Sequence, residues 1–276
     1  MKIACGTVLF RQHPLEKALD IIKSIGFEYV ETQSVGPWCP HVNVETDDPI
    51  RYAELVKSYG FKGTTALWMR NGQLISNDSV VEWAIRTLEW AKAAGIPVVN
   101  TGDGFKKHDM TDEAAMALYR ARIEKILEAC ERLETKIAIE PHGTFSLTGD
   151  GLANLMAASD SKWLGVNYDA CNIYRASYVE SKDDCHRTVK LENKDDEAEV
   201  LRRVIGRVVH VHAKDYLAGH CAPLGEGNVK VAECLEILKN AGYSGAVSLE
   251  TEGDESLEVS TEFARKGYAF LREHLG

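Results

Sequence analysis

The chain has 276 residues, in which 42 acidic side chains outnumber 32 basic ones and give a formal net charge of −10. Apolar residues make up 45% and charged residues 27%, close to the globular average, which argues against disorder and fibrous folds. The acidic balance argues against a nucleic-acid partner, because phosphate backbones are held by clusters of Lys and Arg. No run of 18 or more apolar residues occurs, so we expect no membrane partner.

The compartment is indicated by the N-terminus and the cysteines. The first residues lack the long apolar stretch of a signal peptide. The seven cysteines are odd in number and scattered, and no CxxC pair occurs. We therefore expect a cytoplasmic protein with free thiols.

Short apolar runs rich in β-branched residues alternate along the chain with segments of helical spacing. The predicted strands are Ile3–Phe10, Tyr29–Val35, Gly63–Trp68, Val98–Thr101, Lys136–Glu140, Leu164–Tyr168, Val208–His212 and Ala246–Glu250. The predicted helices are Leu15–Ile25, Ser79–Ala94, Asp112–Leu133 (with Thr111 or Asp112 as N-cap), Gly151–Ala158, Lys194–Val204, Val229–Ala241 and Ser256–Leu275.

This alternation predicts an α/β fold with a parallel sheet. Eight strand–helix units in about 250 residues match the closed (β/α)8 TIM barrel. No linker rich in Pro, Gly or Ser divides the chain, so we expect one domain over residues 1–276. The charged segment Arg175–Asp196 is expected to be an irregular loop on the barrel rim. An open doubly wound sheet competes, but no GxGxxG follows the first strand.

Active sites of such barrels lie at the carboxyl ends of the strands. Four successive predicted strands each deliver an acid or imidazole there: Glu140, Asp169, His212 and Glu250. Singly, each is as easily a capping or solvated side chain. Together, three oxygen donors and one imidazole predict a site for one divalent metal ion. Mn²⁺ is the first candidate; Mg²⁺, Co²⁺ and Fe²⁺ suit the same donors, and Zn²⁺ stays open.

Three further polar residues near the strand ends are expected to have structural roles and not to bind metal. His210 lies two residues before His212 and therefore on the same face; we expect a hydrogen-bonded interior histidine. Glu31 and Asp103 are expected to be capping or solvated acids.

Four residues near these ends are candidates for substrate binding. His142 could donate to a substrate oxygen, or hydrogen-bond a metal ligand. Lys214 could neutralise an enolate or contact a sugar hydroxyl, or form an interior ion pair with Asp215 or Glu140. Trp38 and Trp68 could stack on the apolar face of a sugar, although packing is the commoner role of rim aromatics.

Several of these segments resemble the xylose isomerase-like barrels, which include sugar isomerases, sugar epimerases, inosose dehydratase and endonuclease IV. The resemblance covers essentially the whole chain. Its residues are His-Val-His-Ala-Lys-Asp (210–215), Pro-Leu-Gly-Glu-Gly (223–227), Ile-Glu-Pro-His (139–142), Tyr-Asp-Ala-Cys-Asn (168–172) and Leu-Glu-Thr (249–251). It implies that Glu140, Asp169, His212 and Glu250 occupy the family's metal-ligand positions. It also implies that Glu140 and Glu250 move protons and that Asn172 faces the substrate.

The chain also departs from two members of this family. Endonuclease IV needs further histidine ligands, where this chain has Asn172 and Gly219-His220-Cys221, so DNA repair is not expected. Ketose epimerases carry an Arg six residues after the metal histidine, and Ala218 stands there. Substrate recognition should therefore differ, with Lys214 or Arg175 compensating.

The residues and the resemblance together predict an enzyme acting on a small carbohydrate: a metal-dependent isomerase or epimerase of a keto-sugar or inosose. Glu140 and Glu250 would share ligation with proton transfer through an ene-diolate. A lyase such as inosose dehydratase or a 3-keto-glycoside lyase would use the same enolate. A non-catalytic sugar-binding barrel is the alternative of another class. Gly225-Glu226-Gly227 lacks the Lys of a phosphate loop, which favours an unphosphorylated substrate; a homo-oligomer stays open.

Overall fold

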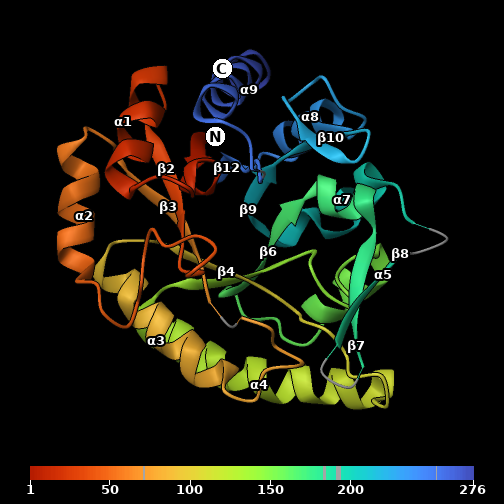
Figure 1. Cartoon of the computed structure of the whole chain (residues 1–276). Helices are drawn as coiled ribbons and strands as arrows, with labels where there is room; N and C mark the ends of the chain where they lie inside the picture. The colour runs from red at the N-terminus through yellow and green to blue at the C-terminus, as the bar shows by residue number, and fades with distance from the viewer. Residues whose placement is uncertain (71, 183–184, 191–193, 253) are drawn as a thin grey trace.

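Eight parallel strands close into a barrel in the computed structural model, and helices surround it (Figure 1). The structure describes residues 1–70, 72–182, 185–190, 194–252 and 254–276. The strands, in order around the barrel, are β1 (Lys2–Gly6), β2 (Tyr29–Gln33), β3 (Gly63–Trp68), β4 (Val98–Gly102), β5 (Lys136–Glu140), β6 (Leu164–Asp169), β9 (Val208–Ala213) and β12 (Ala246–Leu249). This confirms the predicted TIM barrel.

The outer layer consists of helices that follow the strands. They are α1 (Leu15–Ile25), α2 (Pro49–Ser58), α3 (Val80–Ala93), α4 (Asp112–Leu133), α5 (Gly149–Met156), α6 (Ala170–Arg175), α7 (Glu197–Val204), α8 (Val231–Asn240) and α9 (Leu257–Leu275), with the 3₁₀ helices η1 (Thr7–Phe10) and η2 (Ile205–Arg207). Helix α9 packs beside α1, so the last helix of the chain lies next to the first (Figure 1).

Helix ends follow from capping residues. Thr111 caps α4, because its side chain accepts a hydrogen bond from the amide of Ala114. Helix α2 is absent from the predicted set, since it buries only Tyr52 and Val56 and its apolar stripe is weak. The start of α2 does carry a sequence signal, because Asp48 is its N-cap and Pro49 occupies the first helical position.

Two segments differ from the prediction. The first strand ends at Gly6, and Thr7–Phe10 forms η1 with all four residues buried; a short apolar run cannot by itself distinguish a strand from a buried turn. The segment expected to be an irregular loop instead contains an antiparallel hairpin of β7 (Ser177–Lys182) and β8 (Cys185–Lys190). A second hairpin joins β10 (Asp215–Leu217) to β11 (His220–Ala222).

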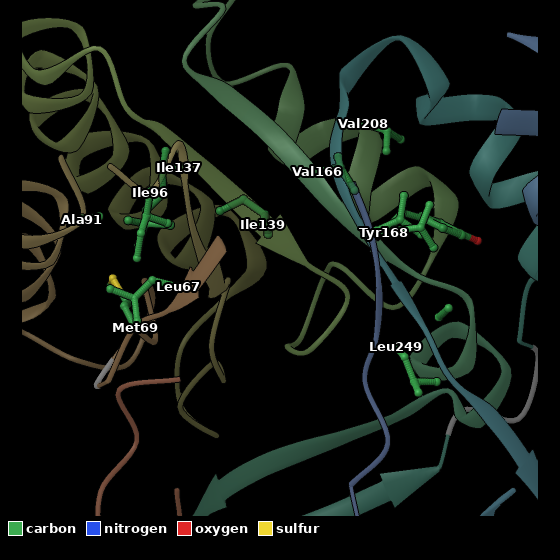
Figure 2. Close-up of a cluster of buried hydrophobic side chains, with 14 of the residues drawn as sticks. Leu67, Met69, Ala91, Ile96, Ile137, Ile139, Val166, Tyr168, Val208 and Leu249 are labelled. Atoms are coloured by element: carbon green, nitrogen blue, oxygen red, sulfur yellow. The ribbon is translucent and has the colours of Figure 1, made fainter. Parts of the chain in front are cut away.

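Side chains alternate between the two faces of each strand, and this places the hydrophobic core on one face and the polar residues of the barrel interior on the other. Figure 2 shows Ile137 and Ile139 of β5 and Val166 and Tyr168 of β6 among the buried apolar side chains. Because successive side chains on a strand point to opposite faces, the residues between and after them face the other way, into the barrel. Glu140 and Asp169 are such residues.

Pairing of the strands sets the level of the site. In the parallel pairing of β6 with β9, Asp169 lies opposite His212, and in that of β12 with β9, Ser248 lies opposite His212. Glu250 follows one residue after the end of β12 and so reaches the same rim. Among the described residues, no helix has both the length and the apolar character needed to cross a membrane.

Candidate metal centre

Four side chains converge at the carboxyl ends of β5, β6, β9 and β12. Glu140, Asp169, His212 and Glu250 each offer one donor atom, and these atoms all lie within 4.8 Å of one another. All four residues are at most 3% exposed. Oδ2 of Asp169 is buried; it makes no hydrogen bond to the described residues but lies 3.1 Å from the Lys214 ammonium. Hard carboxylate oxygens beside one imidazole fit a divalent metal ion, and its identity is left open by this donor set.

His212 has a carboxylate on each edge of its ring. Its Nδ1 lies 3.2 Å from Oε2 of Glu140 and 3.1 Å from Oε2 of Glu250, whereas its Nε2 lies 2.8 Å from Oε1 of Glu31. Burial lowers the pKa of His212, but the three carboxylates together outweigh burial and hold that pKa well above its usual value. The Nδ1 edge therefore faces the cluster, and the Nε2 edge is held from behind.

Glu31 is the group behind His212, and sequence reasoning missed it. It is 1% exposed, and its Oε1 also accepts a hydrogen bond of 2.9 Å from the Asn100 amide. Burial acts to raise the pKa of Glu31, but His212 and His210 outweigh it and lower that pKa. The expectation of a capping or solvated acid is therefore wrong for Glu31. Its place in the middle of β2 was the available signal, since an acid within a barrel strand has to be partnered.

For Asp103 the expected capping role is confirmed, although this residue is buried and not solvated. Its carboxylate accepts hydrogen bonds from the backbone amides of Phe145 and Ser146, at 2.7 and 3.2 Å, and from the Ser146 hydroxyl at 2.6 Å. It thus caps the turn after β5. Burial raises the pKa of Asp103 to about 6 in spite of these hydrogen bonds.

Glu140 is held by two amides. Asn172 donates to its Oε1 at 2.7 Å, and Asn167 donates to its Oε2 at 3.1 Å. Burial raises the pKa of Glu140 to about 8, and the negative charges of Glu250 and Asp169 act in the same direction. Asn172, expected to face the substrate, therefore lies against one of the four acids of the cluster.

Lys214 is buried among carboxylates. Its Nζ lies 2.8 Å from Oε2 of Glu250, 2.9 Å from Oε2 of Glu252 and 3.1 Å from Oδ2 of Asp169. Burial lowers the pKa of Lys214, but these acids outweigh it and raise the pKa well above the usual value. An interior ion pair is thus present, although its partners are not Asp215 or Glu140.

Asp215 stabilises the loop that follows β10 and β11. Its Oδ2 accepts hydrogen bonds from the amides of Gly225 and Gly227, at 3.0 and 2.9 Å. A Cβ at Gly227 would lie 2.0 Å from Oδ1 of Asp215, so only glycine fits there. This close approach accounts for the Gly-Glu-Gly segment without any phosphate.

His210 is an interior histidine, as expected. Its Nδ1 lies 3.0 Å from Oδ1 of Asn167, and its Nε2 lies 3.2 Å from Oγ1 of Thr65. Burial lowers the pKa of His210 to about 4. His210 therefore supports the cluster from below through Asn167, which also contacts Glu140.

A cavity of about 250 Å³ opens onto the cluster. Glu140 and Glu250 lie among its lining residues, and so do three of the expected substrate-binding residues, Trp38, Trp68 and His142. The rings of Trp68 and His142 meet edge to face, with their centroids 5.8 Å apart. We call this space the metal cavity. Arg175 lines a neighbouring pocket instead.

Comparisons with known proteins identify the family of this chain. The sequence model of the xylose isomerase-like TIM barrel family matches residues 19–274. Inosose dehydratase from Clostridium botulinum is 21% identical over 187 residues, which cover 60% of this chain and 57% of that protein. The matches cover only 24% to 57% of the length of these curated relatives.

Solved structures show the same fold over the full chain. A D-tagatose 3-epimerase-like protein superposes with a TM-score of 0.78 at 20% identity, covering 100% of this chain and 97% of the other. The 3-keto-D-glucoside 4-epimerase from Escherichia coli gives 0.77 at 16% identity, covering 99% of both chains. Since the family match spans nearly all of the sequence and the barrel is that of the family, the protein belongs to the xylose isomerase-like TIM barrel family.

Proposed function

We propose that the protein is a divalent-metal-dependent isomerase or epimerase of a keto-sugar or inosose. One observation carries the proposal: two buried carboxylates, Glu140 and Glu250, flank Nδ1 of His212 and line one small cavity. Two acids facing the same space can remove and return a proton at one carbon atom. The names of the inosose dehydratase and of the two epimerase-type structures support the substrate class.

Glu140, Asp169, His212 and Glu250 would hold one divalent cation, with Mn²⁺ as the first candidate. Such a cation polarises a carbonyl oxygen and the neighbouring hydroxyl of a sugar, and so lowers the pKa of the C–H bond beside the carbonyl.

The proton is moved by the chain's own carboxylates. One of Glu140 and Glu250 takes the proton from carbon, which leaves the electron pair in the ene-diolate, and the other returns a proton to carbon. Hydrogen bonds aim both acids: Gln33 donates to Oε1 of Glu250 at 2.9 Å, and Asn172 donates to Oε1 of Glu140. Fixed carboxylates need little reorganisation during the transfer.

The remaining groups bind and shield the substrate. Trp38 and Trp68 would stack on the apolar face of the sugar and exclude water from the metal cavity. His142 would donate to a substrate oxygen at the mouth of the same cavity. Lys214 balances the charge of Glu250 and is placed to steady a developing enolate.

A lyase is the second candidate, favoured by the similarity to inosose dehydratase. It would form the same enolate and then expel a leaving group from the β-carbon, as water or as an alcohol. A non-catalytic sugar-binding barrel needs only one sugar contact at this point, and the second buried acid argues against it.

The test is proton NMR of keto-sugars, inososes and 3-keto-glycosides in D₂O, with metal-depleted protein and with added Mn²⁺ that is removed before the spectra are taken. Deuterium beside the carbonyl only in the presence of metal would support the proposal. Rearranged sugar identifies an isomerase or epimerase, and a conjugated enone or a freed aglycone identifies a lyase. Failure to bind any divalent ion would refute the four-ligand site.

A further inference from the structure

A second pocket adjoins the metal cavity on the rim of the barrel. Its volume is about 570 Å³, and it shares Trp38 and Glu252 with the metal cavity. We call it the outer pocket. Its other lining residues include Arg11, Arg175, Tyr216 and Glu255.

The outer pocket is built by the segments that follow five neighbouring strands. Arg11 follows η1 after β1, Trp38 follows β2, and Arg175 ends α6 after β6. Tyr216 belongs to β10 after β9, and Glu255 follows β12. Because all five segments emerge at the carboxyl ends of the strands, the outer pocket lies on the same face as the metal cavity.

Two polar atoms of the outer pocket lack partners. Arg11 is 9% exposed; its Nη2 donates to Asp254 at 2.6 Å, whereas its Nη1 is buried and has no hydrogen bond to the described residues. Oε2 of Glu255 is likewise buried and without such a hydrogen bond. One is a donor and the other an acceptor. Buried polar atoms are seldom left unsatisfied; a ligand hydroxyl would accept from the Arg11 atom, and a second would donate to the Glu255 atom, once these side chains turn toward the pocket that they line.

Aromatic rings form the walls. Trp38 is 43% exposed, with the Arg11 guanidinium 4.7 Å from its ring centroid. The Arg175 guanidinium lies 5.0 Å from the ring centroid of Tyr216. Arginines that stack on these rings hold them in place, and rigid aromatic rings beside polar groups are suited to a polyol with an apolar face.

The charges of the outer pocket argue against an anionic ligand. Glu252, Asp254 and Glu255 all line it, and Asp254 already neutralises Arg11. Arg175 also lines the pocket, and Lys214 pairs with Glu252, so the lining has no excess positive charge to hold a phosphate. A neutral ligand rich in hydroxyl groups needs no such charge.

We propose that the outer pocket is a second sugar subsite, so that the substrate is a neutral glycoside of two rings, with its keto-ring in the metal cavity. The metal cavity, at about 250 Å³, is smaller than the roughly 300–1,000 Å³ typical of pockets for drug-sized ligands and suits one ring. The outer pocket supplies the room for the other. This inference rests on the proposed function for the identity of the reacting ring.

The experiment compares kcat/KM for the 3-keto derivatives of trehalose, maltose and cellobiose with that for methyl 3-keto-glucoside. We expect at least one two-ring substrate to be preferred, and Glu255→Ala and Tyr216→Leu to lower the ratio of two-ring to one-ring kcat/KM about tenfold, the loss of one well-made contact. Arg86→Ala is the matched control, because Arg86 pairs with Glu45 and Glu82 on the protein surface and lines neither the metal cavity nor the outer pocket, and it should leave the ratio unchanged. Equal kcat/KM for one and two rings in the wild type, or an equal loss for both in the variants, overturns the subsite.

A binding measurement separates this inference from the proposed function. If no sugar is turned over, isothermal titration calorimetry still measures binding at the outer pocket. The ligands are the parent disaccharides, methyl glucoside and glucose 6-phosphate. Tighter binding of a disaccharide that is lost in Glu255→Ala supports the subsite even though the reaction proposed above has failed. Equal affinity for one and two rings, or tighter binding of glucose 6-phosphate than of any disaccharide, refutes it.

Discussion

Replacing Glu31 by Gln is expected to weaken metal binding although Glu31 is not one of the four ligands. The imidazole of His212 can offer Nδ1 to a cation only when its other nitrogen, Nε2, carries the proton. Oε1 of Glu31, 2.8 Å from Nε2, accepts that proton in a hydrogen bond and so selects this tautomer. Glu31→Gln keeps the shape and one acceptor but removes the negative charge.

The size of the effect follows from the contacts that are lost. Removing a carboxylate behind a metal-binding histidine typically costs about 10- to 100-fold in metal affinity, or about 1.4–2.7 kcal/mol. Glu31→Gln should lie near the tenfold end, because a side-chain carbonyl can still accept from Nε2 and from Asn100. Glu31→Ala should lie near the hundredfold end, since both donors then lose their acceptor.

Isothermal titration of metal-depleted protein with Mn²⁺ measures the affinity, and thermal unfolding in EDTA measures the stability. Glu197→Gln is the matched control: Glu197 is also a buried acid, 5% exposed, but it binds the backbone amide of Lys230. That variant should bind Mn²⁺ like the wild type. An unchanged Mn²⁺ affinity in Glu31→Gln, with the fold intact, would refute the role of Glu31.

Three other predictions concern charge. Lys214→Met should destabilise the metal-free protein by about 3–5 kcal/mol, because Glu250 and its neighbours lose their buried counter-charge; added Mn²⁺ should recover much of the fall in Tm, and an unchanged Tm in EDTA would contradict this. The folded-state pKa of Asp103, about 6 against 3.8, means that the folded protein holds this proton more tightly. The contribution of Asp103 to stability should therefore fall by about 2 kcal/mol as pH rises from 4 to 7. Denaturant unfolding of the wild type and of Asp103→Asn across this range measures it, and parallel pH profiles of the two proteins would contradict the reasoning. Glu140→Gln should abolish deuterium exchange while sugar binding persists by titration; retained exchange would favour a different base.

The barrel and the four-residue cluster could be predicted from the sequence for one physical reason. The acid or imidazole at the end of an apolar strand, as at Glu140, Asp169 and His212, marks where the strand ends and which side chains face the barrel interior. Such polar groups are buried only where partner groups surround them. Parallel strands then place all their carboxyl ends on one face. These two rules place the four side chains on one face, and the family resemblance assigned them as ligand positions. The structure adds that their donor atoms lie within 4.8 Å of one another.

The partners within the cluster could not be predicted in the same way. Lys214 reaches Glu252 and Glu250 through a long flexible side chain, and the choice between these acids and Asp215 depends on loop geometry that has no periodic signal. The hairpin of β7 and β8 was hidden by its charged composition, since antiparallel pairing in a rim segment does not require apolar alternation.

The charge of the site gives an argument for a cation that is independent of donor type. Five carboxylates, those of Glu31, Glu140, Asp169, Glu250 and Glu252, contact Lys214 or His212 directly, and all but Glu252 are buried. These two residues supply at most two positive charges, so ionisation of all five acids leaves three negative charges in surroundings of low dielectric constant. Burial is the main cause of the raised pKa of Glu140, and the negative charges of Glu250 and Asp169 add to it. A divalent cation bound at Nδ1 would replace one proton of His212, so the excess with all five acids ionised would fall from three negative charges to two. It would also favour loss of the proton from Glu140, which is the state in which Glu140 can act as a base.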